Sequence, residues 1–366
     1  MGRIMHLART VAAALALTVV PIAAGTHPAV AGVTPSGHVF IQTNDAAGNA
    51  ILAFHRAEDG TLRLDESVAT GGLGIAPTGL GSQASLAITD DGDRLVAVNA
   101  GSDDVSLLDI DPDGLHLIDV TPVGDQPVSV AVHRSIVYVL NQGADTIQGL
   151  RIAGHQLIPI PHSVRELSGT GVGAAQVAFS PDGDLLAVTE KLTQTIDTFI
   201  VRPNGRTTGP NAQASAGPTP FGFQFGADGR LYVSEAPGSA ASSYQVSDDG
   251  TLDVISASVA NHQTAACWLV VTSDGRFAYT ANAGSANVSR YRIAANGTLN
   301  LAGSGVAGVT DPGPVDLDLT GDGHLYVLNS ASGSITGFSV DASNGSLSPS
   351  GGATGFVIGA AGLIAT

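Results

Sequence analysis

Residues 265–293 read AACWLVVTSDGRFAYTANAGSANVSRYRI, and this stretch predicts three short strands separated by two tight turns. In the first strand, Cys267 and Leu269 alternate with Trp268 and Val270, the period of two that is typical of a strand. The Ser-Asp-Gly turn at 273–275 leads to a second strand at 277–280, and Asn-Ala-Gly-Ser at 282–285 leads to a third at 289–293. The stretch therefore predicts one antiparallel meander.

The same unit recurs along almost the whole chain. The residue that ends the second strand can be aligned in seven places: Asn44, Asn99, Asn141, Glu190, Glu235, Asn282 and Asn329. The mean spacing, (329 − 44)/6 or about 47 residues, is in the range of propeller blades. Seven units of four short strands predict an all-β fold, a seven-bladed β-propeller.

A chain of 366 residues is longer than the roughly 250–300 residues at which a single hydrophobic core stops growing. A repeat array avoids this limit because each blade needs only its neighbours to cover its faces. The 47 glycines and the 5% of aromatic residues fit many short strands joined by turns. We therefore expect one propeller domain over residues 32–366.

Residues 1–31 have the order of features of a secretory signal peptide. Arg3 and Arg9 precede an apolar run at 11–24, and small residues at 29–31 offer a cleavage site after Ala31. A membrane anchor is the alternative, but the run is shorter than the about 20 residues a spanning helix needs, and Pro21 interrupts it. We expect a secreted, extracellular protein without a membrane span in the mature chain.

The mature chain is strongly acidic. The 1–31 segment carries two of the 15 Lys and Arg residues and none of the 32 Asp and Glu residues, so 13 cations face 32 anions and the net charge is −19. Such a surface repels phosphate backbones and anionic lipids, which excludes nucleic acid and membrane surfaces as partners. Cys267 is the one cysteine, so no internal disulfide can form, and we expect a monomer.

The first unit lacks an inner strand, and the end of the chain supplies one. Residues 360–365, AAGLIA, resemble the first strands of other units, such as residues 84–89. We therefore expect the C-terminal strand to pair with the first unit and close the ring, which removes exposed strand edges.

Two other stretches invite a functional interpretation. Residues 109–114, DIDPDG, match the first half of a calcium-binding loop, but no glutamate follows at the closing position and equivalent turns recur at 58–62, 248–252 and 295–299. We interpret all four as hairpin turns and expect no metal and no cofactor. The connection at 159–173, with His162, Arg165 and Glu166, is expected to be irregular.

The repeats resemble those of a known family. FSPDG at 179–183, LYV at 231–233, FAYTAN at 277–282 and LYVLN at 325–329 are similar to the repeat of the lactonase-like seven-bladed propellers, which include 6-phosphogluconolactonase and the carboxymuconate cyclases and share YVTN-type repeats. The resemblance covers essentially the whole mature chain. It implies a hydrolase that opens a small sugar-acid or muconate-type lactone at one mouth of the central channel.

The family's catalytic pattern is largely replaced. Ala-Ala at 174–175 stands where the family usually has Arg-His, Asn-Ala-Gly at 282–284 where it has Asn-Arg-Gly, and Ala-Cys-Trp at 266–268 where it has Ala-Glu-Ile. Glu190 matches the family's acidic position, and Lys191 or Arg165 would have to replace the missing cations. A non-catalytic extracellular propeller that binds a small molecule, a glycan or a protein is therefore the alternative.

Glu190 and Glu235 replace the asparagine of the repeat in adjacent units. Because the end of each second strand lies on the same ring face as the start of each first strand, both should lie around one mouth. We predict catalytic roles for Glu190, Glu235 and Lys191, and ligand binding by Phe221, Cys267 and Trp268. The alternative is that each glutamate hydrogen-bonds the following turn as the asparagines do.

Overall fold

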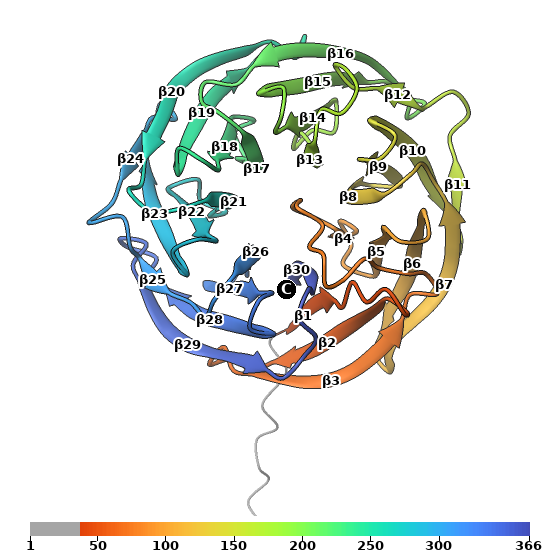
Figure 1. Ribbon diagram of the computed structural model, residues 1–366, viewed down its shortest axis with the longest axis horizontal. Helices are drawn as coiled ribbons and strands as arrows, with labels where there is room; N and C mark the ends of the chain where they lie inside the picture. Colours follow the sequence, from red (N-terminus) through yellow and green to blue (C-terminus); the bar gives the residue numbers. More distant parts are fainter. Residues whose placement is uncertain (1–36) are drawn as a thin grey trace, which may run out of the picture. The chain divides into compact units, whose positions relative to one another are not determined.

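The computed structural model describes residues 37–366, which form a ring of seven antiparallel sheets (Figure 1). The predicted seven-bladed, all-β propeller is confirmed, and the described residues contain no helix. In the same residues no helix is long and apolar enough to cross a membrane. The predicted signal peptide lies outside the described residues.

Each blade runs from an inner strand at the ring axis to an outer strand at the rim, and we number the blades from the N-terminal end. Blade 1 is β30 (Ala361–Ala365), β1 (Gly37–Gln42), β2 (Ala50–Arg56) and β3 (Leu62–Ala69). Blade 2 is β4 (Leu86–Ile88), β5 (Arg94–Asn99), β6 (Asp104–Asp111) and β7 (Gly114–Pro122). Blade 3 is β8 (Pro127–His133), β9 (Ile136–Asn141), β10 (Thr146–Ala153), β11 (Gln156–Pro159) and β12 (Arg165–Glu166). Blade 4 is β13 (Ala174–Phe179), β14 (Leu185–Glu190), β15 (Thr195–Val201) and β16 (Thr207–Ala214).

The remaining blades follow the same order. Blade 5 is β17 (Pro220–Phe225), β18 (Leu231–Glu235), β19 (Ala240–Val246) and β20 (Leu252–Ala260). Blade 6 is β21 (Ala266–Val271), β22 (Phe277–Asn282), β23 (Asn287–Ile293), β24 (Leu299–Leu301) and β25 (Gly308–Val309). Blade 7 is β26 (Pro314–Leu319), β27 (His324–Asn329), β28 (Ser334–Val340) and β29 (Leu347–Thr354).

The outer strand is split in blades 3 and 6. In blade 3, β11 pairs with one end of β10 and β12 with the other, where Arg165 lies opposite Ile147. The expectation of an irregular connection at 159–173 was therefore wrong for Arg165 and Glu166. These residues complete the outer edge because the backbone of β10 beyond β11 still needs a hydrogen-bonding partner.

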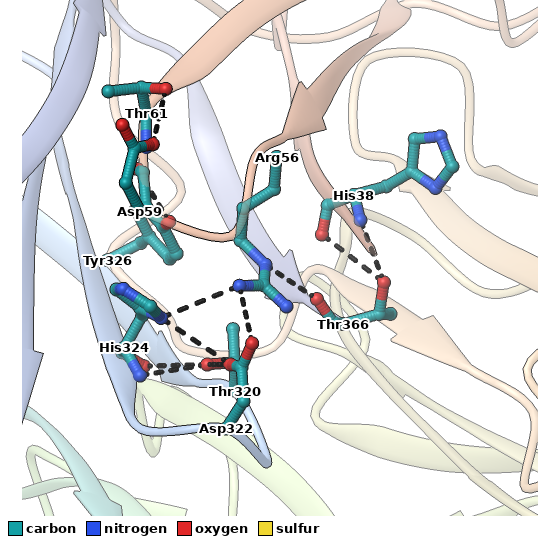
Figure 2. A network of polar contacts seen from close by, with 10 residues as sticks. His38, Arg56, Asp59, Thr61, Thr320, Asp322, His324, Tyr326 and Thr366 are labelled. Carbon is teal, nitrogen blue, oxygen red and sulfur yellow. Dashed lines mark hydrogen bonds and ion pairs between the residues drawn. The ribbon is translucent and has the colours of Figure 1, made fainter. Parts of the chain in front are cut away.

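The C-terminal strand closes the ring as predicted. β30 pairs antiparallel with β1, with Phe40 opposite Ile364. Figure 2 shows the polar contacts beside this seam, where the buried Arg56 side chain lies between blade 7 and the C-terminal residue. Its Nε donates to the Thr366 oxygen at 2.9 Å and its Nη1 to Asp322 Oδ2 at 2.9 Å. The seam is thus held by strand pairing and by a buried cation.

Adjacent blades are joined by apolar layers and by tyrosines of the repeat. Tyr138, Tyr279 and Tyr326 occupy the same position of the second strand, and each hydroxyl donates to a glycine carbonyl in an outer hairpin turn of the next blade, at 2.7–2.8 Å. The tyrosine of the "YV" in the sequence repeat therefore has a physical role. Its aromatic ring is buried in the interface between two blades, and its hydroxyl has a hydrogen-bond partner in the next blade. The hairpin turns predicted at 58–62, 248–252 and 295–299 are present.

The inner strands carry the feature that shapes the channel mouth. The pairing of the first and second strands shifts register near the start of the inner strand in six blades, as between Pro314 and Leu317 in blade 7. A β-bulge re-aims a side chain and locally ends regular pairing. The bulges all lie on the face where inner strands begin and second strands end, and we call this face the mouth.

Candidate functional site

The repeat asparagines at the mouth join the strands of their own blade. Asn282 Nδ2 donates to Asn287 Oδ1 at 2.7 Å and to Ser289 Oγ at 2.8 Å, both on the third strand. Asn99 and Asn329 make the same pair of contacts, five and seven residues further along the chain. In these three blades the side chain at this position therefore fastens the end of the second strand to the start of the third.

Glu190 occupies the same position in blade 4 but has different partners, in the connection before the blade and in the turn after its second strand. Its Oε1 accepts from Ser168 N at 3.0 Å and its Oε2 from Ser168 Oγ and Thr193 Oγ1, each at 2.5 Å. Seven residues further on lies Asp197, which is also fully buried and whose Oδ2 accepts from Ser168 N at 2.9 Å. Burial, and next the negative charge of Glu190, raise the pKa of Asp197 to about 8. The Asp197 carboxyl is therefore mostly protonated at neutral pH.

Glu235 in blade 5 is held by serine hydroxyls of its own blade. Its Oε1 accepts from Ser242 Oγ and its Oε2 from Ser258 Oγ, and the side chain is fully buried. Burial raises the pKa of Glu235, and the two hydroxyls lower it by less. Gly217 lies against this carboxyl, because a Cβ there would be 2.0 Å from Oε2. The Glu235 carboxyl is thus directed into its own blade, whereas the Glu190 carboxyl faces the connection between blades 3 and 4.

Four of the predicted site residues come together at the mouth. The Lys191 Nζ lies 4.9 Å from the centre of the Phe221 ring, and the Phe221 and Trp268 rings are 5.2 Å apart in an edge-to-face arrangement. Cys267 lies close enough to Lys191 for their charges to interact. Burial lowers the pKa of Lys191 to about 8 and raises that of Cys267 to about 12, so the thiol is protonated at neutral pH.

A segment of the chain crosses the channel at this point. Residues 79–85, which precede β4, run toward the middle of the ring (Figure 1). The Gln83 side chain pairs with the Leu269 backbone in blade 6, with Nε2 donating to O at 2.9 Å and Oε1 accepting from N at 3.1 Å. Trp268 Nε1 donates to Ser82 O at 2.8 Å, and Lys191 Nζ donates to Gly81 O at 2.5 Å. We call residues 79–85 the crossing segment.

A pocket of about 220 Å³ lies between the crossing segment and the inner strands of blades 6, 7 and 1. Its walls are formed by Gly79, Leu80, Gly81, Ser82, Trp268, Val315, Asp316, Ser330, Ala360, Ala361 and Gly362. We call it the mouth pocket. Trp268 forms part of its wall, whereas Glu190 and Glu235 are not among its lining residues. Lys191 lies next to it, hydrogen-bonded to the lining residue Gly81.

Sequence reasoning missed the crossing segment and Asp316. The segment belongs to the long connection between the first two units, whose glycines gave no periodic signal, and Gly81 adopts a φ of +62° there. Asp316 is an acid within the apolar inner strand PVDLDL, and an acid in such a strand is the signal that could have identified it. Both depend on which residues face the axis, which the repeat alignment alone does not specify.

The turn that resembles a calcium loop has a different environment. Asp109 forms an ion pair with Arg94 at 2.9 Å and contacts His155 at 3.1 Å. Asp111, Asp113 and His116 place one ligand atom each within 4.8 Å of one another, and all three are exposed. Exposed acidic groups of this kind are common in the absence of any ion, and the sequence offers no closing glutamate.

The fold and the mouth define a seven-bladed propeller with a small pocket near its axis. The sequence matches the family model described as "Lactonase, 7-bladed beta-propeller" over residues 20–268 and 251–357. The chain therefore belongs to the lactonase family of seven-bladed β-propellers, as the repeats indicated.

Solved structures agree with this fold. A Bacteroides fragilis protein provisionally named as a 6-phosphogluconolactonase is similar with a TM-score of 0.73 and 23% identity, over 90% of this chain and 98% of that one. The periplasmic gluconolactonase PpgL of Pseudomonas aeruginosa is similar with a TM-score of 0.72 and 16% identity, over 90% and 99%. A Lactobacillus plantarum protein gives 0.73 and 19%, over 90% and 99%. A search of curated proteins found no match.

Proposed function

We propose that this protein hydrolyses a small lactone in the mouth pocket. The observation that carries the proposal is a pocket beside the channel axis, walled by Trp268 and bordered by the chain's one lysine, in a member of the lactonase family. The similarity of the fold to the gluconolactonase PpgL supports this class of reaction. The substrate is a small molecule, and the reaction consumes water without a cofactor.

Lys191 is the cation that we assign to the site. The family resemblance implies arginines at two positions that are alanine here, 174 and 283, and the Lys191 ammonium group lies at the same mouth. When water attacks a lactone carbonyl, negative charge develops on the carbonyl oxygen and remains on the product carboxylate. A fixed positive group at the rim stabilises this charge, and the π face of Phe221 and the Gly81 carbonyl orient the ammonium group.

Glu190 and Glu235 act at a distance from the reacting atoms in this proposal. Their carboxyls hold the strand ends from which Lys191 and the turn at 236–239 follow. They are therefore positioning residues. Cys267, whose thiol has a raised pKa and is buried outside the pocket lining, packs beside the site and is not the nucleophile.

A lactone panel tests the function. Purified protein should open at least one γ- or δ-lactone faster than buffer, measured by proton release at constant pH. Lys191→Met should lower kcat by about 10²-fold, the usual effect of removing one such group, while Lys191→Arg retains part of the rate. Arg165→Met is the matched control, because that guanidinium donates to the backbone oxygens of Thr207 and His162. Absence of turnover across the panel would refute the proposal.

A non-catalytic binding propeller is the second candidate, and one observation favours it. Lys191 Nζ and Trp268 Nε1 both donate to carbonyls of the crossing segment, so the polar atoms of the mouth already have partners. Saturable binding of a lactone, small glycan or protein without turnover would support this function over hydrolysis.

Export is part of the proposal. The charge order and apolar run of residues 1–31 support cleavage after Ala31 and a secreted protein of net charge −19. N-terminal sequencing of protein recovered from the culture medium should begin at Gly32. A mature protein that retains Met1 in the membrane fraction would contradict it.

A further inference from the structure

Asp316 occupies an unusual position in the wall of the mouth pocket. It lies at the bulge of β26, its backbone has a φ of +68°, and its side chain is 4% exposed. A left-handed conformation is uncommon for a residue other than glycine, and such residues cluster at functional sites. The fold therefore holds a carboxyl group at the pocket wall in a strained backbone conformation.

One oxygen of this carboxyl has no partner. Oδ1 accepts from the Leu317 backbone N–H at 3.0 Å, whereas Oδ2 is buried and forms no hydrogen bond. An unpaired buried polar atom is costly, so such an atom at a pocket wall indicates a group that a ligand completes. Glu190 and Glu235 differ in this respect, because both oxygens of each have donors.

The protonation of Asp316 follows from its surroundings. Burial raises its pKa to about 8, and the negative charge of Asp318 also raises it. The Leu317 backbone N–H, which donates to Oδ1, lowers the pKa by less, as do the N–H groups of Ala84 and Leu363, which approach the carboxyl without forming a hydrogen bond of good geometry. At pH 7 the carboxyl is therefore mostly neutral, and its O–H is available as a donor.

The remaining walls restrict the ligand. Leu80, Trp268, Val315, Ala360 and Ala361 are apolar, and no arginine, lysine or histidine is among the lining residues. At about 220 Å³ the pocket is smaller than the roughly 300–1,000 Å³ of sites for drug-sized ligands. A phosphate group would lie in this apolar space beside a carboxyl without a cation inside the pocket, which is strongly unfavourable.

We propose that the mouth pocket takes a small, uncharged, unphosphorylated lactone with a largely apolar body, and that Asp316 donates a hydrogen bond to its carbonyl oxygen. This inference rests on the proposed function. Water adds to the carbonyl carbon, and the Asp316 O–H stabilises the charge that develops on the carbonyl oxygen. The ring C–O bond then breaks, the ring oxygen takes up one proton of the water, and the hydroxy acid releases the other to solvent as it ionises.

Two variants isolate the Asp316 side chain without opposing its backbone conformation. Asparagine tolerates a positive φ and can donate from its amide, while glycine adopts that φ freely and removes the group. Asp318→Asn is the matched control on the same strand, because both of its oxygens accept from backbone N–H groups, of Leu319 at 2.8 Å and Ala365 at 2.9 Å. Thermal unfolding of each variant reports whether it remains folded.

The readouts are lactone hydrolysis and calorimetric binding of a lactam, an analogue that keeps the carbonyl and resists hydrolysis. We expect faster turnover of a γ-lactone with a short alkyl chain than of 6-phosphogluconolactone. Asp316→Gly should lower kcat by about 10²-fold and weaken lactam binding at least 10-fold. Asp316→Asn should stay within about 10-fold of wild type, and Asp318→Asn should bind the lactam as wild type does.

The outcomes separate this inference from the proposed function. Preference for the phosphorylated lactone, or equal lactam affinity in wild type and Asp316→Gly, would overturn the inference while hydrolysis itself stands. Lactam binding that depends on Asp316 in a protein without lactone turnover would refute the proposed function and retain Asp316 as the ligand-contacting group. Absence of lactam binding in wild type would overturn both the substrate class and the role of Asp316.

Discussion

Replacing Asp197 with asparagine should flatten the pH dependence of the protein's stability. The Asp197 carboxyl is fully buried beside Glu190, and its pKa is raised from the usual 3.8 to about 8. A carboxyl with a raised pKa in the folded state binds a proton that the unfolded chain has lost. Its contribution to stability is therefore complete below about pH 4 and is lost as the pH rises through about 8.

The magnitude follows from proton linkage. One extra proton on the folded state makes the free energy of unfolding fall by about 1.4 kcal/mol per pH unit. Between pH 5 and 7 Asp197 thus accounts for a loss of up to about 3 kcal/mol in wild type, and Asp197→Asn should remove this loss. Glu235, Asp316 and Asp318 also have raised pKa values, but they contribute equally to both proteins and cancel in the difference.

The assay is urea unfolding at half-unit steps from pH 5 to 8, with the free energy of unfolding plotted against pH for each protein. Asp182→Asn is the control: its hydrogen bond from Ser180 holds the pKa of that carboxyl below its usual range, so this variant should parallel wild type above pH 5. Parallel curves for wild type and Asp197→Asn would refute the argument that Asp197 is protonated in the folded state at neutral pH.

Two further predictions concern the blades and the seam. Glu235→Asn restores the repeat asparagine. Among the hydrogen bonds of the described residues, the Glu235 side chain bonds only to Ser242 and Ser258, so the rate of lactone hydrolysis should stay within about twofold of wild type. A well-folded variant without activity would place the residue in the site. Arg56→Met should lower the free energy of unfolding in urea by about 3 kcal/mol, since it leaves the partners of a buried guanidinium unpaired. The control Arg63→Met, which removes the exposed ion pair with Asp65, should lower it by less than about 1 kcal/mol. Equal losses of stability would show that the network in Figure 2 does not stabilise the seam.

The blade architecture could be predicted because it depends on local patterns that repeat. The strand alternation of residues 265–293, the turn residues and the seven aligned strand ends each point to the same fold. The ring closure by residues 361–365 could also be predicted from the sequence, since a unit without an inner strand must obtain one elsewhere. The second half of the split outer strand in blade 3 could not be predicted, because a two-residue strand such as Arg165–Glu166 is too short to show an alternation of apolar and polar residues.

The site was predictable only in part. The structure brings together Lys191, Phe221, Cys267 and Trp268. Their positions in the repeat, at the ends of second strands and the starts of first strands, were enough to place them at the mouth. Glu190 and Glu235 were located at the correct face, but whether a side chain there turns to the channel or into its blade depends on partners such as Ser168 and Ser258. Those partners lie 22 and 23 residues away along the chain, outside the strand and turn that carry the repeat motif. The orphaned oxygen of Asp316 likewise arises only when three blades and the crossing segment meet.

The central claim is that the mouth pocket is the reaction site, and a crystal structure of the protein with a bound short-chain γ-lactam tests it most directly. The account predicts the lactam ring against Trp268, with its carbonyl oxygen within hydrogen-bond distance of Asp316 Oδ2. A lactam bound instead in the groove between blades 4 and 5 near Asp182 and Asp228, or an empty mouth pocket at saturating lactam, would contradict it.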